Sequence, residues 1–347
     1  MSKINANIII KNIFLLTATV FISILFLPPA NVQAKPAITL TYANFPPAST
    51  FVCVQMEKWK EEIEKKTNGT VKINTFPNGT LLSAKNMING VINGQADIGC
   101  LCMAYQPGRF MVTNALGLPF GFKDAKSGTI ALIEIFKKYN PEEFKNVKVI
   151  GLFTNAPANI YSKKPVTSLK DLEKMKLRAS GGIADVITAL GGNAVGMPQS
   201  DTPEALQKGV VDGAVSSLET LMDLNYSELC REVTILNGPL YSFAVVMNLK
   251  KYNSLPNDIK KIFEDFMEEH SMWTAEYMDA HVEDSISWSM EKYNITINQF
   301  NDNETTEINK RVEVLFEEYI KDTIKEKIPG RDIISDIYNS IEQQKTK

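Results

Sequence analysis

One pattern occurs twice in the chain and constrains its fold more than any other feature. Residues 91–99 read V-I-N-G-Q-A-D-I-G, residues 206–213 read L-Q-K-G-V-V-D-G, and the copies begin about 115 residues apart. In each copy a helix is expected to end at a glycine, and the chain enters a strand through an aspartate. The repetition predicts two similar α/β lobes, each built from β-α-β units. A chance likeness of two helix ends is the alternative, because glycine often follows a helix.

A long segment near the end of the chain predicts how the lobes are joined. With 347 residues, 44% of them hydrophobic, the chain can fold around two cores. After Pro256 no glycine or proline occurs up to about Tyr293, and apolar residues recur at helical spacing. A helix of about 36 residues would reach on the order of 54 Å and lie across both lobes. Two helices separated by a bend are the alternative.

The predicted fold is therefore α/β, with two lobes, mostly parallel sheets and a long helix that bridges both lobes. Apolar strands at 147–153 and 238–248 are expected to carry the chain to the second lobe and back. We expect lobe I at 35–153 plus 244–275, lobe II at 154–243 plus 276–325, and a C-terminal helix and tail at 326–347. Two helices, at 303–325 and 330–341, are expected to close the chain.

The first 34 residues predict a secretory signal peptide. They contain no acid, carry Lys3 and Lys11, and run apolar from Ile13 to Leu27 before small residues that end in V-Q-A. We expect export to the periplasm and cleavage after Ala34. An uncleaved anchor helix is the alternative, but the apolar run of about 15 residues is shorter than the roughly 20 that span a bilayer.

Charge and composition exclude several kinds of partner. Removing residues 1–34 takes away two lysines and no acid, which leaves 35 basic and 40 acidic residues and a charge of about −5. A mildly acidic chain without a basic block is not expected to bind nucleic acid. Cys100 and Cys102 lie one residue apart in an apolar strand, where we expect buried thiols. His270 and His281 are too few and too distant to make a metal site, so no cofactor is expected.

Arg178 is the candidate ligand-binding residue. The chain has five arginines, and this one ends a short apolar run directly before A-S-G-G. Its side chain should therefore leave a strand end where the backbone is free to bend. A planar guanidinium can bind a carboxylate in a bidentate way, which an ammonium group cannot do. An ordinary surface salt bridge is the alternative for an isolated arginine.

The stretch around Arg178 carries a family resemblance. Leu177-Arg178 is followed by M-P-Q-S-D at 197–201 and by A-L-Q-K-G-V-V-D-G at 205–213. In order and spacing this resembles the solute-binding proteins of TRAP transporters, the DctP-like family, as do L-P-F at 118–120 and K-P-V at 164–166. The resemblance implies a two-lobe periplasmic binding protein fold. It also implies a binding subunit, not an enzyme, that captures a small organic carboxylate through an arginine and delivers it to the membrane subunits of a TRAP carrier.

One departure from the family limits the choice of ligand. Relatives that bind sialic acid carry a second arginine just before the K-P-(I/V) turn, and its place is held here by Ala158. The asparagine that those relatives present after the D-G strand falls at Ser216. The resemblance therefore does not imply a sugar acid, although the carboxylate anchor at Arg178 is retained.

Other residues are expected near the cleft because they follow strands or lie in loops at the same edge. The candidate aromatic walls are Phe45, Tyr105 and Tyr241, and the candidate hydrogen-bond partners are Gln106, Asn155 and Ser216. For each aromatic residue, core packing is the alternative. Several aromatic residues with one arginine favour a monocarboxylate with an apolar or aromatic body over a dicarboxylate.

Two other functions remain as alternatives. The same fold and pocket would serve a ligand-presenting partner of a periplasmic sensor kinase. A periplasmic hydrolase would need a serine or cysteine beside a base, and the sequence has neither G-x-S-x-G nor H-E-x-x-H. Both histidines lie mid-helix among acids, where we expect solvated side chains. The protein is expected to act as a monomer.

Overall fold

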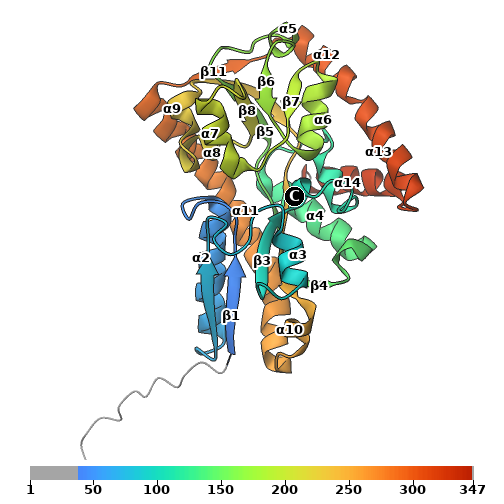
Figure 1. Ribbon diagram of the computed structural model, residues 1–347. Coiled ribbons are helices and arrows are strands. Elements are labelled where there is room, and N and C mark those ends of the chain that lie inside the picture. Colours follow the sequence, from blue (N-terminus) through green and yellow to red (C-terminus); the bar gives the residue numbers. More distant parts are fainter. Residues whose placement is uncertain (1–37, 346–347) are drawn as a thin grey trace, which may run out of the picture. The chain divides into compact units, whose positions relative to one another are not determined.

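The structure is a computed structural model that describes residues 38–345 (Figure 1). The expected signal peptide and its cleavage after Ala34 lie outside this part of the chain. The strands are β1 (Ile38–Ala43), β2 (Val71–Phe76), β3 (Ile98–Cys102), β4 (Val147–Thr154), β5 (Ala158–Ser162), β6 (Lys176–Arg178), β7 (Asn193–Val195), β8 (Gly213–Ser216), β9 (Glu232–Gly238), β10 (Ser242–Asn248) and β11 (Thr296–Gln299). The helices are α2 (Phe51–Lys66), α3 (Met87–Ile92), α4 (Ala125–Tyr139), α5 (Leu169–Leu172), α6 (Gly181–Ala189), α7 (Thr202–Gln207), α8 (Thr220–Asp223), α9 (Tyr226–Leu229), α10 (Leu249–Asn253), α11 (Asn257–Tyr293), α12 (Asp302–Val312), α13 (Val314–Lys325) and α14 (Gly330–Lys345).

The first sheet has the strand order β2-β1-β3-β10-β4. β1 is parallel to β2 and β3, whereas β10 is antiparallel to both of its neighbours, β3 and β4. All seven residues of β10 are buried, as expected for an apolar strand covered on both faces. The prediction that this segment returns to the first sheet is confirmed.

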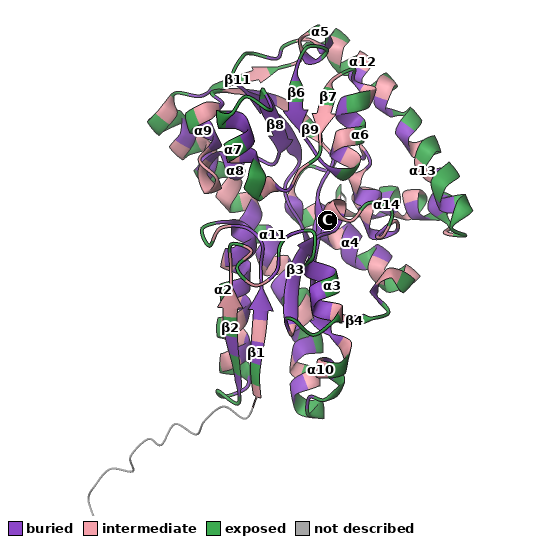
Figure 2. Ribbon diagram, viewed as in Figure 1, coloured by how far each residue is buried: buried purple, intermediate pink, exposed green. Residues whose placement is uncertain are grey.

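The second sheet has the order β11-β9-β5-β8-β6-β7. Its parallel pairs are β6 with β7, β6 with β8, and β9 with β11, while β5 is antiparallel to β8 and β9. The α/β fold is confirmed, and its sheets are mixed. In each sheet the antiparallel pairs involve one strand, β10 or β5, that the chain enters after crossing from the other sheet. Figure 2 shows that the strands labelled near the centre of the molecule, such as β3 and β8, are largely buried.

The two copies of the repeated pattern have the same local structure. Gly94 and Gly209 end their helices with φ of 76° and 69°, a region that glycine enters without steric cost. Just before β3, Asp97 Oδ2 accepts the backbone N–H of Thr41 at 2.8 Å. Just before β8, Asp212 Oδ2 accepts the backbone N–H of Lys176 at 2.9 Å. In both copies the aspartate therefore fixes the start of its strand to the parallel neighbour, which supports a structural repeat over a chance likeness.

The long helix is continuous. α11 has 37 residues and packs against α2, α4 and β4 as well as against α8 and α9, so it contacts elements beside both sheets. The bridging helix is therefore confirmed, and the alternative of two bent helices is wrong. Within residues 38–345, no helix is both long enough and apolar enough to cross a bilayer.

Two parts of the secondary structure differ from the predictions. The helix expected at 303–325 is divided at Glu313 into α12 and α13, and β9 forms in a stretch where no strand was expected. Glu313 has helical dihedral angles, so the division interrupts the helix only locally. The residue boundaries of the two lobes stay a prediction.

Candidate functional site

Arg178 is the last residue of β6, at the carboxyl end of the strand, as expected. Its side chain is fully buried, with 0% exposure. Nε and Nη2 donate to the carbonyl oxygen of Met197 at 2.9 and 2.7 Å, and Nη1 donates to Oε1 of Gln199 at 2.5 Å. The M-P-Q segment thus holds one side of the guanidinium.

Two tyrosines hold the other side of the guanidinium. Nη2 donates to the hydroxyl of Tyr105 at 3.1 Å, and Nη1 donates to the hydroxyl of Tyr241 at 3.3 Å. The same hydroxyl oxygens accept the backbone N–H groups of Gln199 and Ser180, both at 3.1 Å. Burial raises the pKa of each phenol, so both hydroxyls stay protonated.

All five N–H groups of Arg178 donate a hydrogen bond, and every acceptor is a neutral group. In the described part of the chain, no carboxylate is among these partners. A buried cation without a paired anion is costly, because the charge has lost its hydration and gained no counter-charge. The site is therefore electrostatically prepared for an anion.

A small cavity of about 40 Å³ lies beside these groups. Its lining includes five of the residues expected from the sequence, namely Phe45, Tyr105, Asn155, Ser216 and Tyr241. The ring of Phe45 meets that of Tyr105 edge-on, with the centroids 5.7 Å apart. Asn155 accepts the backbone N–H of Tyr241 at 2.6 Å and donates to the hydroxyl of Ser217 at 2.9 Å. The structure thus brings these residues together next to Arg178.

Gln106 does not lie at this cavity. Its amide donates to the carbonyl oxygen of Lys85 at 2.8 Å. It follows the 3-10 turn of residues Met103–Tyr105, in which successive side chains point about 120° apart. Tyr105 therefore reaches Arg178 while its neighbour points elsewhere.

Among the polar cavity-lining residues that were missed in the sequence, two have a buried atom without a partner. Gln199 Nε2 and Glu219 Oε2 are both buried without a hydrogen-bond partner. Gln199 belongs to the M-P-Q-S-D motif, and Glu219 follows the carboxyl end of β8 by three residues. The rule that ligands lie beyond strand ends would have found Glu219. Burial raises the pKa of its carboxyl to about 8.

The cavity is too small for a ligand in this conformation. Ligand pockets usually have about 300–1,000 Å³, whereas a space of about 40 Å³ holds a few water molecules. Tyr105, which follows β3 of the first sheet, already reaches Arg178 of the second sheet. The backbones of Gly117 and Gly182 are also in close contact, since a Cβ on Gly182 would lie 2.1 Å from the Gly117 carbonyl oxygen. A ligand therefore has to enter while the two sides are apart, and the side chains that now fill the cavity have to move before the sides close around it.

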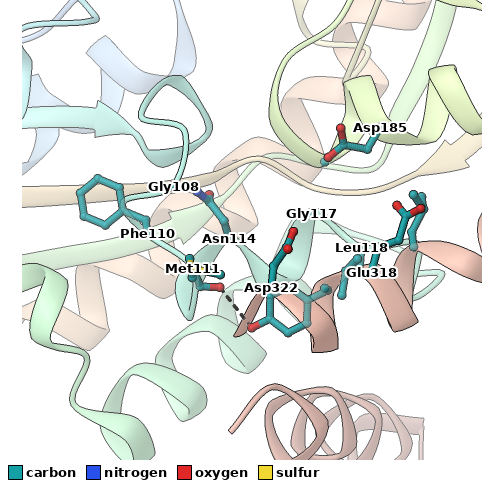
Figure 3. Close-up of a pocket in the computed structure, with 12 residues that line it drawn as sticks. Gly108, Phe110, Met111, Asn114, Gly117, Leu118, Asp185, Glu318 and Asp322 are labelled. Carbon is teal, nitrogen blue, oxygen red and sulfur yellow. Dashed lines mark hydrogen bonds between the residues drawn. The ribbon is translucent and has the colours of Figure 1, made fainter. Parts of the chain in front are cut away.

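A larger cavity of about 350 Å³ lies elsewhere, between the η2 turn (Thr113–Gly117), α6 and α13 (Figure 3). Three acids, Asp185, Glu318 and Asp322, are among the residues around it. Burial first, and then the charge of Glu318, raise the pKa of Asp185. An organic anion would be repelled here, so this cavity does not compete with the site at Arg178.

The two histidines differ from the expectation that they are solvated. His270 is 2% exposed, its Nε2 lies 3.1 Å from Gln55 Oε1, and burial lowers its pKa to about 3. His281 is largely buried and pairs with Asp223 at 2.7 Å. Within residues 38–345 neither ring has a serine or cysteine as a hydrogen-bond partner, and no cluster of three metal-ligating side chains occurs. The expectation of solvated histidines was wrong because one face of α11 packs against helices that lie beside both sheets.

The four cysteines are all free and buried. Cys100 and Cys102 lie on β3 with 0% and 1% exposure, so their expected burial is confirmed. Burial raises the pKa of the Cys53 and Cys230 thiols to about 12. These thiols are therefore protonated and act as small apolar groups.

Comparison with known proteins shows the family. Residues 42–322 match the DctP family, described as bacterial extracellular solute-binding protein, family 7. A solute-binding protein from Roseobacter denitrificans is 30% identical over 177 residues, which cover 50% of this chain and 54% of that protein. The matched part thus spans about half the length of this curated relative.

Solved structures extend the likeness over most of the chain. A TRAP periplasmic solute-binding protein from Desulfovibrio salexigens is 45% identical, with a TM-score of 0.79, 88% of this chain covered and 95% of that one. That structure is an open complex with the C-terminus of a symmetry mate bound in the ligand-binding site. A marine metagenome TRAP solute-binding protein, specific for aromatic acid ligands and in complex with metahydroxyphenylacetate, is 26% identical, with a TM-score of 0.84 and coverage of 88% and 99%.

These relatives are solute-binding proteins rather than enzymes. The family match covers most of the chain, and the Desulfovibrio likeness extends over nearly all of the described residues. The chain therefore belongs to family 7 of the bacterial extracellular solute-binding proteins, the DctP family of TRAP solute-binding proteins.

Proposed function

We propose that this protein captures a small organic monocarboxylate in the periplasm, through a salt bridge to Arg178, and delivers it to the membrane subunits of a TRAP transporter. One observation carries the proposal. The Arg178 guanidinium is completely buried, and all five of its hydrogen bonds go to neutral acceptors. A ligand carboxylate would supply the missing negative charge.

The ligand would take over hydrogen bonds that neutral groups now accept. Gln199 Oε1 and the two tyrosine hydroxyls are the side-chain acceptors of Arg178, and they can move away, whereas the Met197 carbonyl is backbone. Hydrogen bonds between charged groups contribute roughly 1.5–3 kcal/mol, more than bonds between neutral groups. The oxygen of Tyr241 accepts from Arg178 and Ser180, so its own proton remains available for the carboxylate.

The remaining lining favours a monocarboxylate with an apolar or aromatic body. Phe45, Phe243 and the two tyrosine rings form the apolar walls. The described residues that line the cavity include no cationic side chain, and Glu219 and Asp223 are present; Arg178 lies behind Tyr105, Gln199 and Tyr241, its hydrogen-bond partners. A second ligand carboxylate would be desolvated without a partner. The metagenome relative that is specific for aromatic acids supports the same ligand class.

Export and assembly complete the proposal. We infer that residues 1–34 direct export, that cleavage follows Ala34, and that the mature protein acts as a monomer. Organic molecules that co-purify with the protein test the ligand class directly, by mass spectrometry after denaturation. We expect an organic monocarboxylate in about one copy per chain. Recovery of only neutral or cationic molecules, together with no thermal stabilisation by a panel of organic acids, would contradict the proposal.

A further inference from the structure

Glu219 is a buried acid that the carboxylate anchor does not explain. It lies just before α8 (Thr220–Asp223), lines the cavity beside Arg178 and is 2% exposed. Its Oε2 atom has no hydrogen-bond partner. More than nine in ten buried polar groups in proteins have a partner, so an exception at a binding cavity needs a cause.

We propose that the Glu219 carboxyl hydrogen-bonds a hydroxyl group on the body of the bound acid, so that the site selects hydroxylated carboxylates over the unsubstituted ones. This inference rests on the proposed function, because it assumes that Arg178 holds the carboxylate of the same ligand. Glu219 then acts as a specificity-determining residue at a second position in the cavity.

A chain of hydrogen bonds holds Glu219 in place. Its carboxyl is hydrogen-bonded to the Ser217 hydroxyl, which accepts from Asn155 Nδ2 at 2.9 Å. Asn155 Oδ1 in turn accepts the backbone N–H of Tyr241, whose hydroxyl contacts Arg178. One side of the carboxyl is therefore fixed by the protein, and Oε2 is left for a group in the cavity.

The other unpartnered atom, Gln199 Nε2, would contact a different part of the ligand. Gln199 binds Arg178 through Oε1, so its free Nε2 belongs to the region of the anchor. Glu219 is not a partner of Arg178 and lies with Ser217, Asp223 and Thr220 on the β8–α8 side. The carboxylate and the hydroxyl of a ligand would thus be held at different places, the carboxylate toward Arg178 and the hydroxyl at Glu219.

The surroundings of Glu219 keep it neutral at neutral pH. Burial is the main cause that raises its pKa to about 8; the Ser217 hydrogen bond lowers the pKa, the Asp223 carboxylate raises it and His281 lowers it. Tyr161, which also faces Glu219, is buried and protonated. A protonated carboxyl can both donate and accept, and it does not repel an anionic ligand. A site that hydrogen-bonds a ligand hydroxyl discriminates strongly against the analogue that lacks it, because its own polar atom is then left unpaired.

Matched pairs of acids test the inference. Calorimetry at pH 6.5 would compare benzoate with its 2-, 3- and 4-hydroxy derivatives, phenylacetate with its 3- and 4-hydroxy derivatives, and butyrate with 3-hydroxybutyrate. We expect the wild type to prefer a hydroxylated member of at least one pair by about tenfold or more. Glu219→Met should remove the preference, Glu219→Gln should retain it, and Glu228→Met, at an exposed glutamate of α9, should behave as the wild type.

The outcomes separate this inference from the proposed function. Acids that bind the wild type in an Arg178-dependent way without a hydroxyl preference would overturn the role of Glu219 alone. A preference that survives in Glu219→Met would overturn it too. If no acid binds, the proposed function and this inference both fail. A second readout is pH: between pH 6.5 and 9 the affinity of the wild type for acids should fall as the Glu219 carboxyl ionises beside the bound anion, while Glu219→Gln should keep its affinity, because an amide does not ionise.

Discussion

The Asp223 carboxylate accepts the backbone N–H of Phe51 at a distance of 3.0 Å, although 172 residues separate the two in the chain. Phe51 is the first residue of α2, and the residue before it, Thr50, makes no side-chain capping bond. Asp223, at the end of α8 beside the second sheet, therefore caps a helix that packs beside the first. Because His281 binds the other carboxylate oxygen at 2.7 Å, the cap is fixed from the long helix as well.

Replacing Asp223 should weaken the contact between the two sides of the site. In Asp223→Ala the α2 N-terminus loses its cap, which costs about 1 kcal/mol of stability. Ligand affinity should also fall by about fivefold or more, since the closed arrangement loses one of its contacts. Urea unfolding and calorimetry measure the two effects.

Asp124→Ala is the matched control. Asp124 caps its own helix, α4, by accepting the N–H of Ser127 at 2.7 Å. We expect a similar loss of stability in this variant with an unchanged ligand affinity. Equal effects of the two variants on affinity would show that Asp223 does not hold the two sides together.

The acid stability of the protein should depend on His270. Its pKa is lowered from 6.5 to about 3 by burial, so the unfolded chain binds a proton that the folded chain does not. This contribution to stability is fully present above pH 6.5 and is lost as the pH falls toward 3, with a slope of about 1.4 kcal/mol per pH unit. Urea unfolding of the wild type between pH 4.5 and 6.5 should show this slope, and His270→Gln should reduce it.

His281→Gln serves as a control of opposite sign. The Asp223 hydrogen bond raises the pKa of His281 above 6.5. Its contribution is fully present below pH 6.5 and is lost as the pH rises through the folded-state pKa. The His281 variant should therefore change the stability on the neutral side and leave the acid slope in place. An acid slope that persists in His270→Gln would contradict the assignment.

Several signals in the sequence coincide at Arg178 and predicted its position at the end of a strand, which the structure shows. A rare residue type, an apolar run that ends in it, and a following glycine pair together predict a strand end at the edge where ligands bind. The repeat could also be recognised from the sequence, because in both copies the glycine ends a helix with a positive φ and the aspartate accepts a backbone N–H group. Gln106 shows the limit of this reasoning: its strand end is at the site, but only side-chain direction decides which of two neighbours reaches Arg178.

The local sequence does not predict the burial of Glu219 or the break at Glu313. Glu219 is an acid after a strand, and only the packing of α8 and α11 around it makes it buried. Nothing like a glycine or proline marks the break between α12 and α13 at Glu313. The burial of His270 could have been predicted, because its spacing from Phe263 and Phe266 continues the apolar stripe of the helix.

Substitution of Arg178 should abolish ligand binding and leave the fold intact. Arg178→Gln removes the charge that a ligand carboxylate pairs with, and losing one partner of a buried charged pair costs about 2–5 kcal/mol, or roughly 30-fold to several thousand-fold in affinity. Arg178→Lys keeps the charge but not the planar fork, so we expect a smaller but clear loss. Calorimetry with the co-purified acid measures both, and circular dichroism checks the fold.

Arg109→Lys is the control for this series. Arg109 donates to Asn89 at 2.9 Å and is absent from the lining of the cavity beside Arg178. Its replacement should leave the affinity unchanged. If Arg178→Gln binds the acid within about twofold of the wild type, the anchor is elsewhere.

Closure of the site should depend on the fact that residue 182 is a glycine and has no side chain. In the described structure a Cβ at this position would lie 2.1 Å from the carbonyl oxygen of Gly117, a backbone atom that cannot rotate away. Gly182→Ala should therefore hold α6 and the η2 turn apart. Overpacking of this kind costs about 1–3 kcal/mol, which corresponds to a fall in ligand affinity of about 5- to 150-fold. Gly196→Ala, where the nearest atom is 3.9 Å away, should have no such effect. Small-angle scattering with saturating ligand should show a more expanded Gly182→Ala protein, and equal profiles and affinities for the two variants would show that this contact does not limit closure.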